Sequence, residues 1–497
     1  MRFPFAKADD FIAALTFVIA VALILISIVV VQLKQKFSPQ LLGARLKRFF
    51  GAELRHLQAH DKNFPGYDLA SIHRALLSYF QDHCEPIDTV GSAAPTLSTR
   101  DMLQTDDRPY GPWRRKPAPM AYERVAVALD EEESFPSNCL YFAKSKTDPA
   151  EKFAVLLSYI RAYRAESGED MDERSAPASV LTLSIACRRR ELADAFFREI
   201  ESRRQRLSVY RGKVIDPVVT AGGIVTIVFR NIARVGENDL VLPKAVRELI
   251  RGSIVNFYTH QTALRALGVE MKRGVLFNSP PGTGKTSVSL YLAGLLPNFT
   301  ICFVSGRRLL YPREVCAMAR YLQPTMLVFE DIDLIAQERE TNGLATVLGE
   351  LMNQIDGCEP NDQVLFIMNT NSMERLEAAV RNRPGRVDQI IHIPLPDRDD
   401  RRRLIHHFAS TVRVSPAAVV ALVDATEGVT PAILKEVIKR AAVMAVQRLA
   451  SDGDGRTGGE IDLTTADLLL SVEQVLALRS DMHKLDPLAR DPIRFGS

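Results

Sequence analysis

The chain has 497 residues, enough for two to four globular units of roughly 100–200 residues each. Hydrophobic residues make up 46% and charged residues 25%, which excludes a wholly disordered chain, a collagen-like chain and a polytopic membrane protein. Lys and Arg number 63 and Asp and Glu 60, a net charge of +3. This balance gives no overall attraction to nucleic acid, so no nucleic-acid partner is expected.

Six cysteines are spread along the chain, and none forms a C-x-x-C pair. Without such spacing, neither a zinc ribbon nor a disulfide framework is expected. Several of the cysteines lie in apolar runs, so we expect reduced, buried thiols. The six are Cys84, Cys139, Cys187, Cys302, Cys316 and Cys358.

Phe11–Leu33 is strongly apolar and contains no charged residue. A helix of this length extends about 35 Å, enough to cross a hydrocarbon core of about 30 Å. The alternative is a signal peptide, but the run is longer than a usual signal core and no small-residue cleavage site follows it. We therefore expect one retained transmembrane helix. Lys34, Lys36 and further basic residues follow it, which places the rest of the chain in the cytoplasm or in an organelle matrix.

The next part of the chain is predicted to form a small α+β domain preceded by a helical segment. Gln40–His83 has apolar residues at helical spacing, and Glu85–Pro119 is rich in Pro, Ser, Thr and charge and is predicted to be a loop or linker. Between residues 122 and 235, three strand-like runs accompany a charged amphipathic helix at Arg189–Arg206. No catalytic constellation is present in this region.

A strand, a glycine-rich loop and a helix follow one another from Gly274 onward. The run GVLFN predicts a buried strand, SPPGTGKT a loop, and the apolar run after it a helix, which is the context of a P-loop. Backbone N–H groups freed by the glycines turn toward phosphate oxygens, Lys285 adds positive charge, and the hydroxyl of Thr286 can ligate Mg²⁺. The predicted cofactors are therefore ATP and Mg²⁺. The residues assigned to the nucleotide are Ser279, Pro280, Pro281, Gly282, Thr283, Gly284, Lys285, Thr286 and Ser287.

One position departs from the P-loop pattern. Ser279 stands where G-x-x-x-x-G-K-[ST] has its first glycine. A positive φ angle there would be costly for serine. We nevertheless expect nucleotide binding to survive.

A second buried strand, Met326–Phe329, ends in acidic residues. Mg²⁺ needs a carboxylate in its outer shell, and an attacking water needs a base or an orienting group. By position, Glu330 is assigned to Mg²⁺ and Asp331 to the water, an order reversed from the usual Asp-Glu. The alternative is that these acids are inactive.

A third strand ends in polar residues, and two arginines follow it. Asn371 stands at the strand tip, where its amide can reach the γ-phosphate or the water. Arg383 and Arg386 lie too far along the chain to reach their own nucleotide easily, but in a head-to-tail ring they would reach the neighbour's. The alternative for each arginine is an ordinary surface ion pair.

The motifs PPGTGKT, EDID, LMNQIDG, NTN and RPGRVD together resemble the AAA subfamily of AAA+ ATPases over roughly Asp239–Leu476. The resemblance implies an α/β P-loop module, with a parallel five-stranded sheet, helices on both faces and a helical lid beginning near Arg401. Thr430 would be the N-cap of the lid helix behind the adenine. The resemblance also implies a homo-oligomeric ring, hexameric or heptameric, that remodels a protein substrate.

The organisation of the chain follows from these assignments. We expect an N-terminal tail at 1–10, the membrane helix at 11–33, a helical segment and linker at 34–118, a small α+β domain at 119–235, the AAA+ core at 236–400, and the lid with a C-terminal tail at 401–497.

Two details bear on the kind of AAA protein. No H-E-x-x-H motif follows the lid, which argues against a membrane protease. The aromatic-aliphatic-Gly loop of threading unfoldases is also missing, and Leu309, Leu310 and Tyr311 are the only apolar candidates in its place. With one membrane helix and a middle domain, the layout resembles the mitochondrial AAA ATPases that translocate the Rieske protein in respiratory-complex-III assembly. The expected location is a bacterial inner membrane, with the ATPase in the cytoplasm.

Three functions remain open at this point. The first is a membrane-anchored ATPase that remodels or translocates a protein. The second is an ATP-binding regulatory or scaffolding module with weak hydrolysis, supported only by Ser279 and the Glu330-Asp331 order. The third is a nucleic-acid motor, which the near-neutral charge and the predicted membrane helix oppose.

Overall fold

The structure is a computed structural model, and the residues it describes are 42–85, 88–91, 119–160, 179–220, 223–232, 235–237, 239–305, 309–333, 345–374, 376, 387–451 and 461–485. Two compact units divide the chain, one of residues 1–209 with 219–227 and one of residues 210–218 with 228–497. Within the described ranges, no helix is both long enough and apolar enough to cross a membrane. The predicted membrane helix Phe11–Leu33 lies outside these ranges, as do Arg383 and Arg386.

The first unit contains an antiparallel sheet of six strands. The strand order is β1-β6-β5-β4-β2, and β3 pairs with β4. Since β1 is first in this order, its outer edge pairs with no strand among the described residues. The strands are β1 (Gln58–Pro65), β2 (Asp88–Gly91), β3 (Ala121–Ala128), β4 (Glu131–Lys144), β5 (Lys152–Ile160) and β6 (Val180–Cys187).

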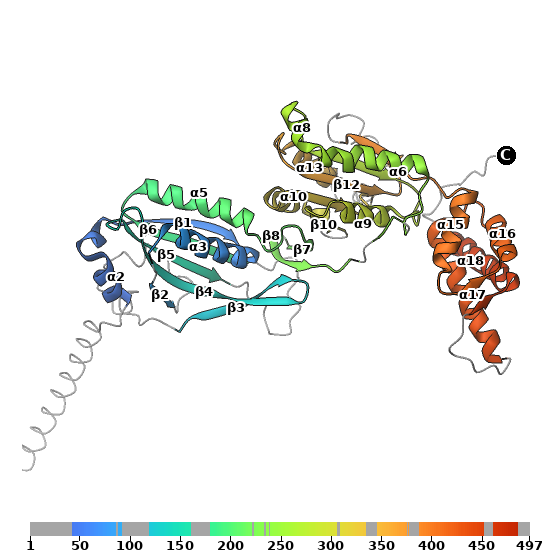
Figure 1. Cartoon of the computed structure of the whole chain (residues 1–497), viewed down its shortest axis with the longest axis horizontal. Coiled ribbons are helices and arrows are strands. Elements are labelled where there is room, and N and C mark those ends of the chain that lie inside the picture. Colours follow the sequence, from blue (N-terminus) through green and yellow to red (C-terminus); the bar gives the residue numbers. More distant parts are fainter. Residues whose placement is uncertain are drawn as a thin grey trace, which may run out of the picture. The chain divides into compact units, whose positions relative to one another are not determined.

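Helices pack on both faces of this sheet. On one face α3 and α5 lie side by side (Figure 1), and the ring of Phe80 contacts that of Tyr141 at 5.2 Å. The next residue, Phe142, points to the opposite face and packs with α2 and η1 in a separate apolar cluster. The helices of the unit are α2 (Leu42–Phe50), η1 (Gly51–His56), η2 (Gly66–Asp68), α3 (Leu69–His83) and α5 (Arg190–Arg206).

Two predictions for the N-terminal segment are wrong in part. The helix predicted over Gln40–His83 is interrupted by β1, and the loop predicted over Glu85–Pro119 contains β2. In β1 only Phe64 is buried, so the strand has no apolar alternation of its own. It is a strand because it pairs with β6 along its whole length. Such a long-range contact overrides local periodicity.

The second sheet has seven strands, where five were predicted. The order is β13-β9-β12-β11-β10-β7-β8, and every neighbouring pair from β13 to β7 is parallel. The two further strands, β7 and β8, come from the segment assigned to the preceding α+β domain, and β7 pairs with the edge of β10. The strands are β7 (Val214–Thr220), β8 (Gly223–Phe229), β9 (Arg273–Asn278), β10 (Thr300–Val304), β11 (Thr325–Phe329), β12 (Val364–Thr370) and β13 (Gln389–His392).

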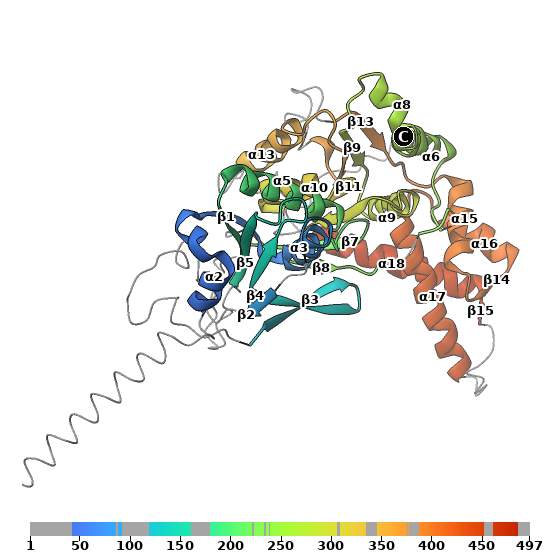
Figure 2. The ribbon, with the colours of Figure 1, turned by 60° about the vertical axis from the view of Figure 1, so that its left-hand side comes forward.

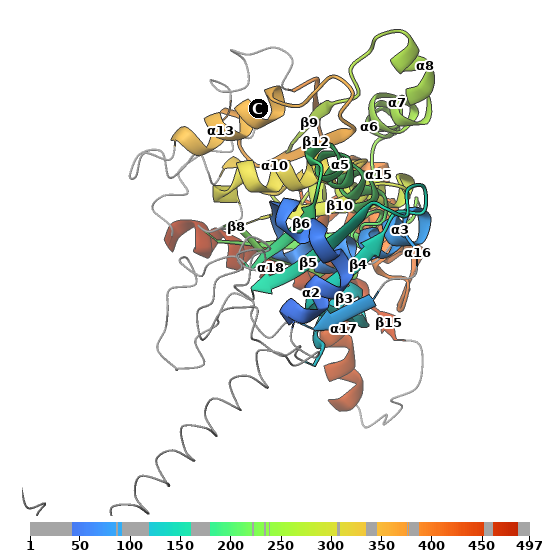
Figure 3. The same cartoon turned by 90° about the vertical axis from the view of Figure 1, so that its left-hand side faces the viewer.

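The central strands of this sheet are buried on both sides, as expected for a parallel sheet covered by helices. Every residue of β10, β11 and β12 is buried. Figure 3 shows α10 and α13 together, with α6, α7 and α8 as a separate group. These helices are α6 (Lys244–Ile250), the π-helix η5 (Arg251–Val255), α7 (Asn256–Thr259), α8 (Gln261–Ala266), α9 (Lys285–Leu295), α10 (Pro312–Tyr321) and α13 (Ala345–Asp356).

The predicted lid is a helical bundle with its own apolar core (Figure 2). Its first helix begins at Arg398, close to the predicted start near Arg401, and Asp397 caps this helix by accepting from the backbone N–H of Asp400 at 2.8 Å. The lid elements are α15 (Arg398–Phe408), β14 (Arg413–Val414), α16 (Pro416–Ala425), α17 (Pro431–Ser451), β15 (Asp462–Leu463) and α18 (Thr465–Leu485).

Candidate nucleotide-binding site

The loop between β9 and α9 has the backbone conformation of a P-loop. Gly282 and Gly284 have φ angles of +83° and +101°, which glycine adopts without steric cost. Gly284 is the N-cap of α9, so the first N–H groups of this helix have no partner inside it. They remain available to a phosphate at the positive end of the helix dipole.

Ser279 does not have the positive φ angle that the sequence pattern suggested. Among the described residues, Asp331 is the non-glycine residue with positive φ. Ser279 is buried, and its hydroxyl shares a hydrogen bond with that of Thr283, which in turn donates to the carbonyl oxygen of Pro280 at 2.9 Å. The expected backbone cost at Ser279 is therefore wrong, because serine fits here in an ordinary conformation and links the two ends of the loop.

Lys285 is 7% exposed, and its ammonium donates to oxygen atoms. It donates to the carbonyl oxygens of Ser279 and Pro280 at 2.8 and 3.2 Å and to Oδ1 of Asn371 at 2.7 Å. Burial lowers the pKa of Lys285, and the carboxylates of Asp331 and Asp333 partly offset this. Among the described residues none of its direct acceptors is a carboxylate, so a phosphate would be the first anion in direct contact with it there.

The acidic pair follows β11 directly. The backbone N–H of Glu330 donates to Val304 of β10, and that of Ile332 donates to Asn369 of β12. The backbone N–H groups of these two residues thus point to different neighbouring strands, although residues two apart in a regular strand point to the same one. The chain turns between them at Asp331, whose φ angle is +52°. This turn leaves the Asp331 side chain exposed at the carboxyl end of the sheet, where ligands of open α/β sheets bind.

Asn371 connects the lysine and the acid. Its Nδ2 donates to Oδ1 of Asp331 at 2.9 Å, while its Oδ1 accepts from Lys285. Asp333 holds Asn371 in place, since Oδ1 of Asp333 accepts from the backbone N–H of Asn371 at 3.1 Å and from the hydroxyl of Thr370 at 3.2 Å. Sequence reasoning assigned no role to Asp333. Its partners lie on another strand, and its place as the third acid of EDID was the only signal.

Glu330 and Thr286 fit the Mg²⁺ that the sequence predicts. Oε1 of Glu330 is buried and has no hydrogen-bond partner among the described residues, and a buried carboxylate oxygen left alone is costly. Carboxylate and hydroxyl oxygens are the protein ligands that Mg²⁺ accepts, usually together with waters and substrate phosphates. Thr286 is exposed in the first turn of α9, as a ligand beside a phosphate must be.

The lid helix α17 contacts the P-loop directly. The backbone N–H of Ala432 donates to the carbonyl oxygen of Gly282 at 3.1 Å. A Cβ atom on Gly282 would lie 2.9 Å from that of Ala432 and 3.1 Å from Oγ1 of Thr430. Thr430 lies at the N-cap position of α17, as predicted, and its carbonyl oxygen accepts from the backbone N–H of Leu434 at 3.0 Å. Its buried hydroxyl has no hydrogen-bond partner among the described residues, so no side-chain cap forms there.

The other residues singled out in the sequence differ in where they lie and how exposed they are. Pro281 lies in the loop and Ser287 in the first turn of α9. Of the apolar candidates for a client-contacting loop, Leu309 is 3% exposed and Leu310 is 39% exposed, so only Leu310 of these two is accessible. The six cysteines are all buried free thiols, as predicted.

Residues 275–395 match the family model "ATPase family associated with various cellular activities (AAA)". This span contains the P-loop, the acidic pair and Asn371. Residues 275–395 form an AAA ATPase domain. The predicted family, its ATP-hydrolysing type and its cofactors ATP and Mg²⁺ are confirmed for this domain.

Several curated proteins are similar to about half of this chain. A proteasome-activating nucleotidase from Aeropyrum pernix is 30% identical over 51% of this chain and 63% of its own length. One from Saccharolobus solfataricus is 31% identical over 44% of this chain and 57% of its own length. An ATP-dependent zinc metalloprotease YME1 homolog from Schizosaccharomyces pombe is 31% identical over 47% of this chain and 34% of its own length.

Each alignment leaves out more than a third of the relative's own length. The activities of those whole proteins therefore do not transfer with the AAA domain. Among solved structures, the FIGL-1 AAA domain is similar with a TM-score of 0.42 at 19% identity, over 51% of this chain and 91% of that one. The resemblance to ATPases of complex-III assembly stays a prediction.

Proposed function

We propose that this chain couples ATP hydrolysis in its AAA domain to the remodelling or translocation of a protein client. The observation that supports hydrolysis, rather than binding alone, is the Lys285–Asn371–Asp331 connection. It links the phosphate-binding ammonium to the acid assigned to the water. The printed names of the relatives, a proteasome activator and a metalloprotease, point to work on proteins.

Each residue of the site has a proposed role. The P-loop N–H groups and Lys285 bind the β- and γ-phosphates. Thr286 and Glu330 hold Mg²⁺, which supplies charge neutralisation at those phosphates. Asp331 accepts a proton from the attacking water or orients it, and Asn371 orients Asp331 while its own amide reaches toward the γ-phosphate.

The proposal extends to a ring and an anchor. Arg383 and Arg386 would act on the nucleotide of a neighbouring copy, in a homo-oligomer of six or seven protomers. Phe11–Leu33 would anchor the chain in a membrane, a bacterial inner membrane by its layout, with the ATPase on the cytoplasmic side. The charge-free apolar run and the lysines after it support the anchor, and the RPGRVD motif supports the ring.

Steady-state ATP hydrolysis by the purified chain tests the function. The wild type is expected to turn over ATP with Mg²⁺, and Lys285→Ala to lose both ATP binding and hydrolysis. Lys435→Ala is the matched control, because Lys435 is an exposed lysine of the lid and its loss should leave both unchanged. A wild-type rate no higher than that of Lys285→Ala would reject the motor and favour the scaffolding alternative.

Mixed oligomers test the ring. Arg386→Ala protomers added to wild type should reduce the total ATPase rate more than in proportion to their fraction, because each would also disable a neighbour's site. A loss strictly proportional to the fraction of variant would mean that the sites are independent.

A further inference from the structure

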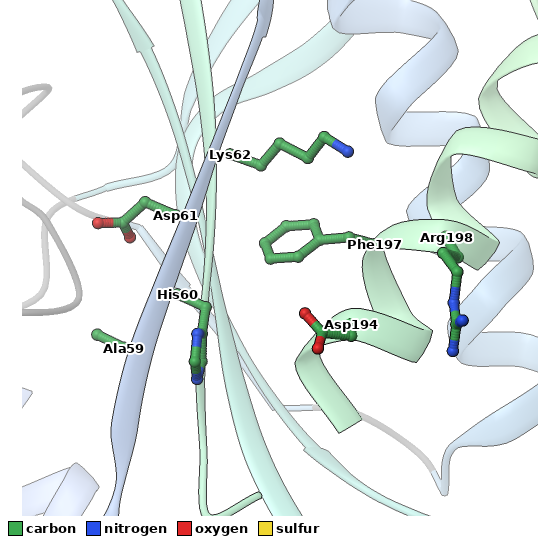
Figure 4. A pocket seen from close by; sticks show the side chains of 7 residues that line it. All are labelled: Ala59, His60, Asp61, Lys62, Asp194, Phe197 and Arg198. Carbon is green, nitrogen blue, oxygen red and sulfur yellow. The ribbon is translucent and has the colours of Figure 1, made fainter. Parts of the chain in front are cut away.

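A shallow pocket of about 710 Å³ lies in the first unit, between β1 and α5 (Figure 4). His60 and Lys62 of β1 line one side, and Asp194, Phe197 and Arg198 of α5 line the other. The sequence motifs and the nucleotide site use none of these residues. The pocket therefore needs its own explanation.

The pocket borders the open edge of the sheet. Among the described residues β1 pairs only with β6. An edge strand presents alternate backbone N–H and C=O groups outward, where another extended chain can pair with them. Pro65 ends β1 and has no N–H, so the edge that can accept a strand extends over residues 58–64.

Beside this edge, side chains of β1 and α5 form a surface with the Phe197 ring at its centre. Figure 4 shows Asp61 and Lys62 on opposite sides of β1, with Lys62 extending toward α5. Nζ of Lys62 lies 2.8 Å from Oε1 of Glu201, an ion pair that joins α5 to the strand. The same Nζ lies 5.9 Å from the ring centre of Phe197. The half-buried Phe197 ring therefore lies next to the edge, where alternate side chains of an added strand would meet it.

The charged groups of the pocket favour an acidic side chain on the added strand, next to the side chain that meets Phe197. Arg198 is exposed and has no ion-pair partner in the part of the chain that the structure describes. Asp194, by contrast, lies 3.7 Å from Arg190. Nε2 of His60 is buried and has no hydrogen-bond partner among the described residues.

We propose that the edge of β1 binds an extended segment of a protein client as an added β-strand. The segment places an apolar side chain over Phe197 and an acidic side chain, two residues away on the same face, at Arg198. Backbone pairing gives affinity with little dependence on sequence, and the pocket selects side chains. This inference rests on the proposed function, which is an ATPase that acts on proteins. It adds a binding site for the client outside the nucleotide-binding unit.

Binding of a labelled peptide to the full chain tests the proposal. The probe is the fluorescein-labelled heptapeptide Ser-Thr-Phe-Thr-Glu-Thr-Ser, measured by anisotropy, with two further versions N-methylated at alternate amides. Only one set of alternate amides can face β1, so one methylated version should bind like the parent and the other at least tenfold more weakly. Equal binding of both versions, or no binding of the parent up to about 1 mM, would overturn the proposal.

Variants locate the site. Phe197→Ala should weaken peptide binding roughly tenfold through the lost ring contact. Arg198→Glu, at an exposed position where folding is not at risk, should weaken it roughly three- to tenfold, and a peptide with Lys in place of Glu should recover the loss. Arg206→Glu is the matched control, because Arg206 is exposed on the same helix outside the pocket. An equal effect of the control would place the binding elsewhere.

Hydrogen exchange separates a client from a segment of the same chain. The peptide should slow exchange of the outward amides within residues 58–64. If these amides are already protected in the free chain, a segment of the chain itself occupies the edge and the proposal is wrong. Lys285→Ala, which should lose hydrolysis, should still bind the peptide. A wild-type chain that binds the peptide but does not hydrolyse ATP would reject only the proposed function. Intact ATPase activity without binding rejects only this inference.

Discussion

The side-chain amide of Asn371 donates to Oδ1 of Asp331 at 2.9 Å, across the tips of two adjacent parallel strands. Asp331 follows β11 and Asn371 follows β12, and the two strands pair in register from Thr325↔Val364 to Phe329↔Met368. The bond can form because Asp331 and Asn371 each lie two or three residues beyond the last pair of the two strands, Phe329↔Met368, so their side chains meet at the same end of the sheet. It fixes the orientation of an acid whose backbone is already constrained by its positive φ angle.

Replacing Asp331 with Asn should separate ATP binding from hydrolysis. Asn is nearly isosteric and tolerates positive φ, so the fold and ATP binding should be kept. Without a carboxylate to activate or orient water, the hydrolysis rate should fall about 10²- to 10⁴-fold. The measurements are ATP titration and steady-state turnover, with Asp399→Asn on the exposed face of α15 as control. An unimpaired rate would exclude Asp331 from the chemistry.

Removing the Asp333 carboxylate should disturb the nucleotide site indirectly, through Asn371. Asp333 is 4% exposed, and its carboxylate accepts from the Asn371 backbone and the Thr370 hydroxyl. Asp333→Ala leaves these donors unpaired and should lower the free energy of unfolding by about 1–3 kcal/mol, measured by urea denaturation. The hydrolysis rate should fall as Asn371 loses its anchor. Asp130→Ala, in the exposed β3–β4 turn, should change neither quantity, and a similar effect of both variants would contradict this role.

Binding of ATP should weaken in alkaline solution earlier than for an ordinary lysine site. Burial lowers the pKa of Lys285 below its usual 10.5. ATP binds the charged form, so affinity is full below the lowered pKa and decreases as the pH rises through it, by at most tenfold per pH unit. Fluorescent-nucleotide titrations from pH 7 to pH 11 measure the midpoint.

A variant checks the assigned cause of this pH dependence. The Asp331 carboxylate raises the pKa of Lys285. Asp331→Asn should therefore move the midpoint of ATP binding to lower pH. A midpoint that moves to higher pH would contradict the assignment.

Two glycine substitutions, one in the P-loop and one in α9, should have opposite effects. Gly282→Ala places a Cβ 2.9 Å from that of Ala432 and requires a φ angle of +83°, so ATP binding should be lost and the contact with α17 broken. Gly294→Ala, inside α9, meets no atom within 4 Å and should stabilise the protein by about 0.5–1 kcal/mol. Thermal unfolding and ATP titration of both variants measure this. If both variants had the same ATP affinity and thermal stability, the close packing of Gly282 against Ala432 would not matter for the site.

The nucleotide site could be predicted from sequence because its residues follow buried strands closely. Lys285, Glu330 and Asp331 each lie within a few residues of a run that is apolar throughout. In a parallel sheet the carboxyl ends of the strands meet at one edge, so the chain itself indicates which polar residues converge. The same logic identified Asn371 but could not choose its partners.

The long-range pairings could not be predicted in this way. The strand β1 has one buried residue and is defined by its pairing with β6, while β7 joins the second sheet through two paired residues. Neither contact leaves a periodic signal, since periodicity reports which side of a segment is buried and not which strand lies beside it.

Sequence by itself determined that the chain contains a P-loop ATPase domain, because phosphate binding needs particular residues at fixed spacing along one short segment. Tertiary structure alone decided that Ser279 is unstrained, that Asp333 supports Asn371, and that Gly282 meets Ala432 of the lid. The last two of these relationships join residues far apart in the chain. They depend on how separate elements pack in space, which no local pattern of residues specifies.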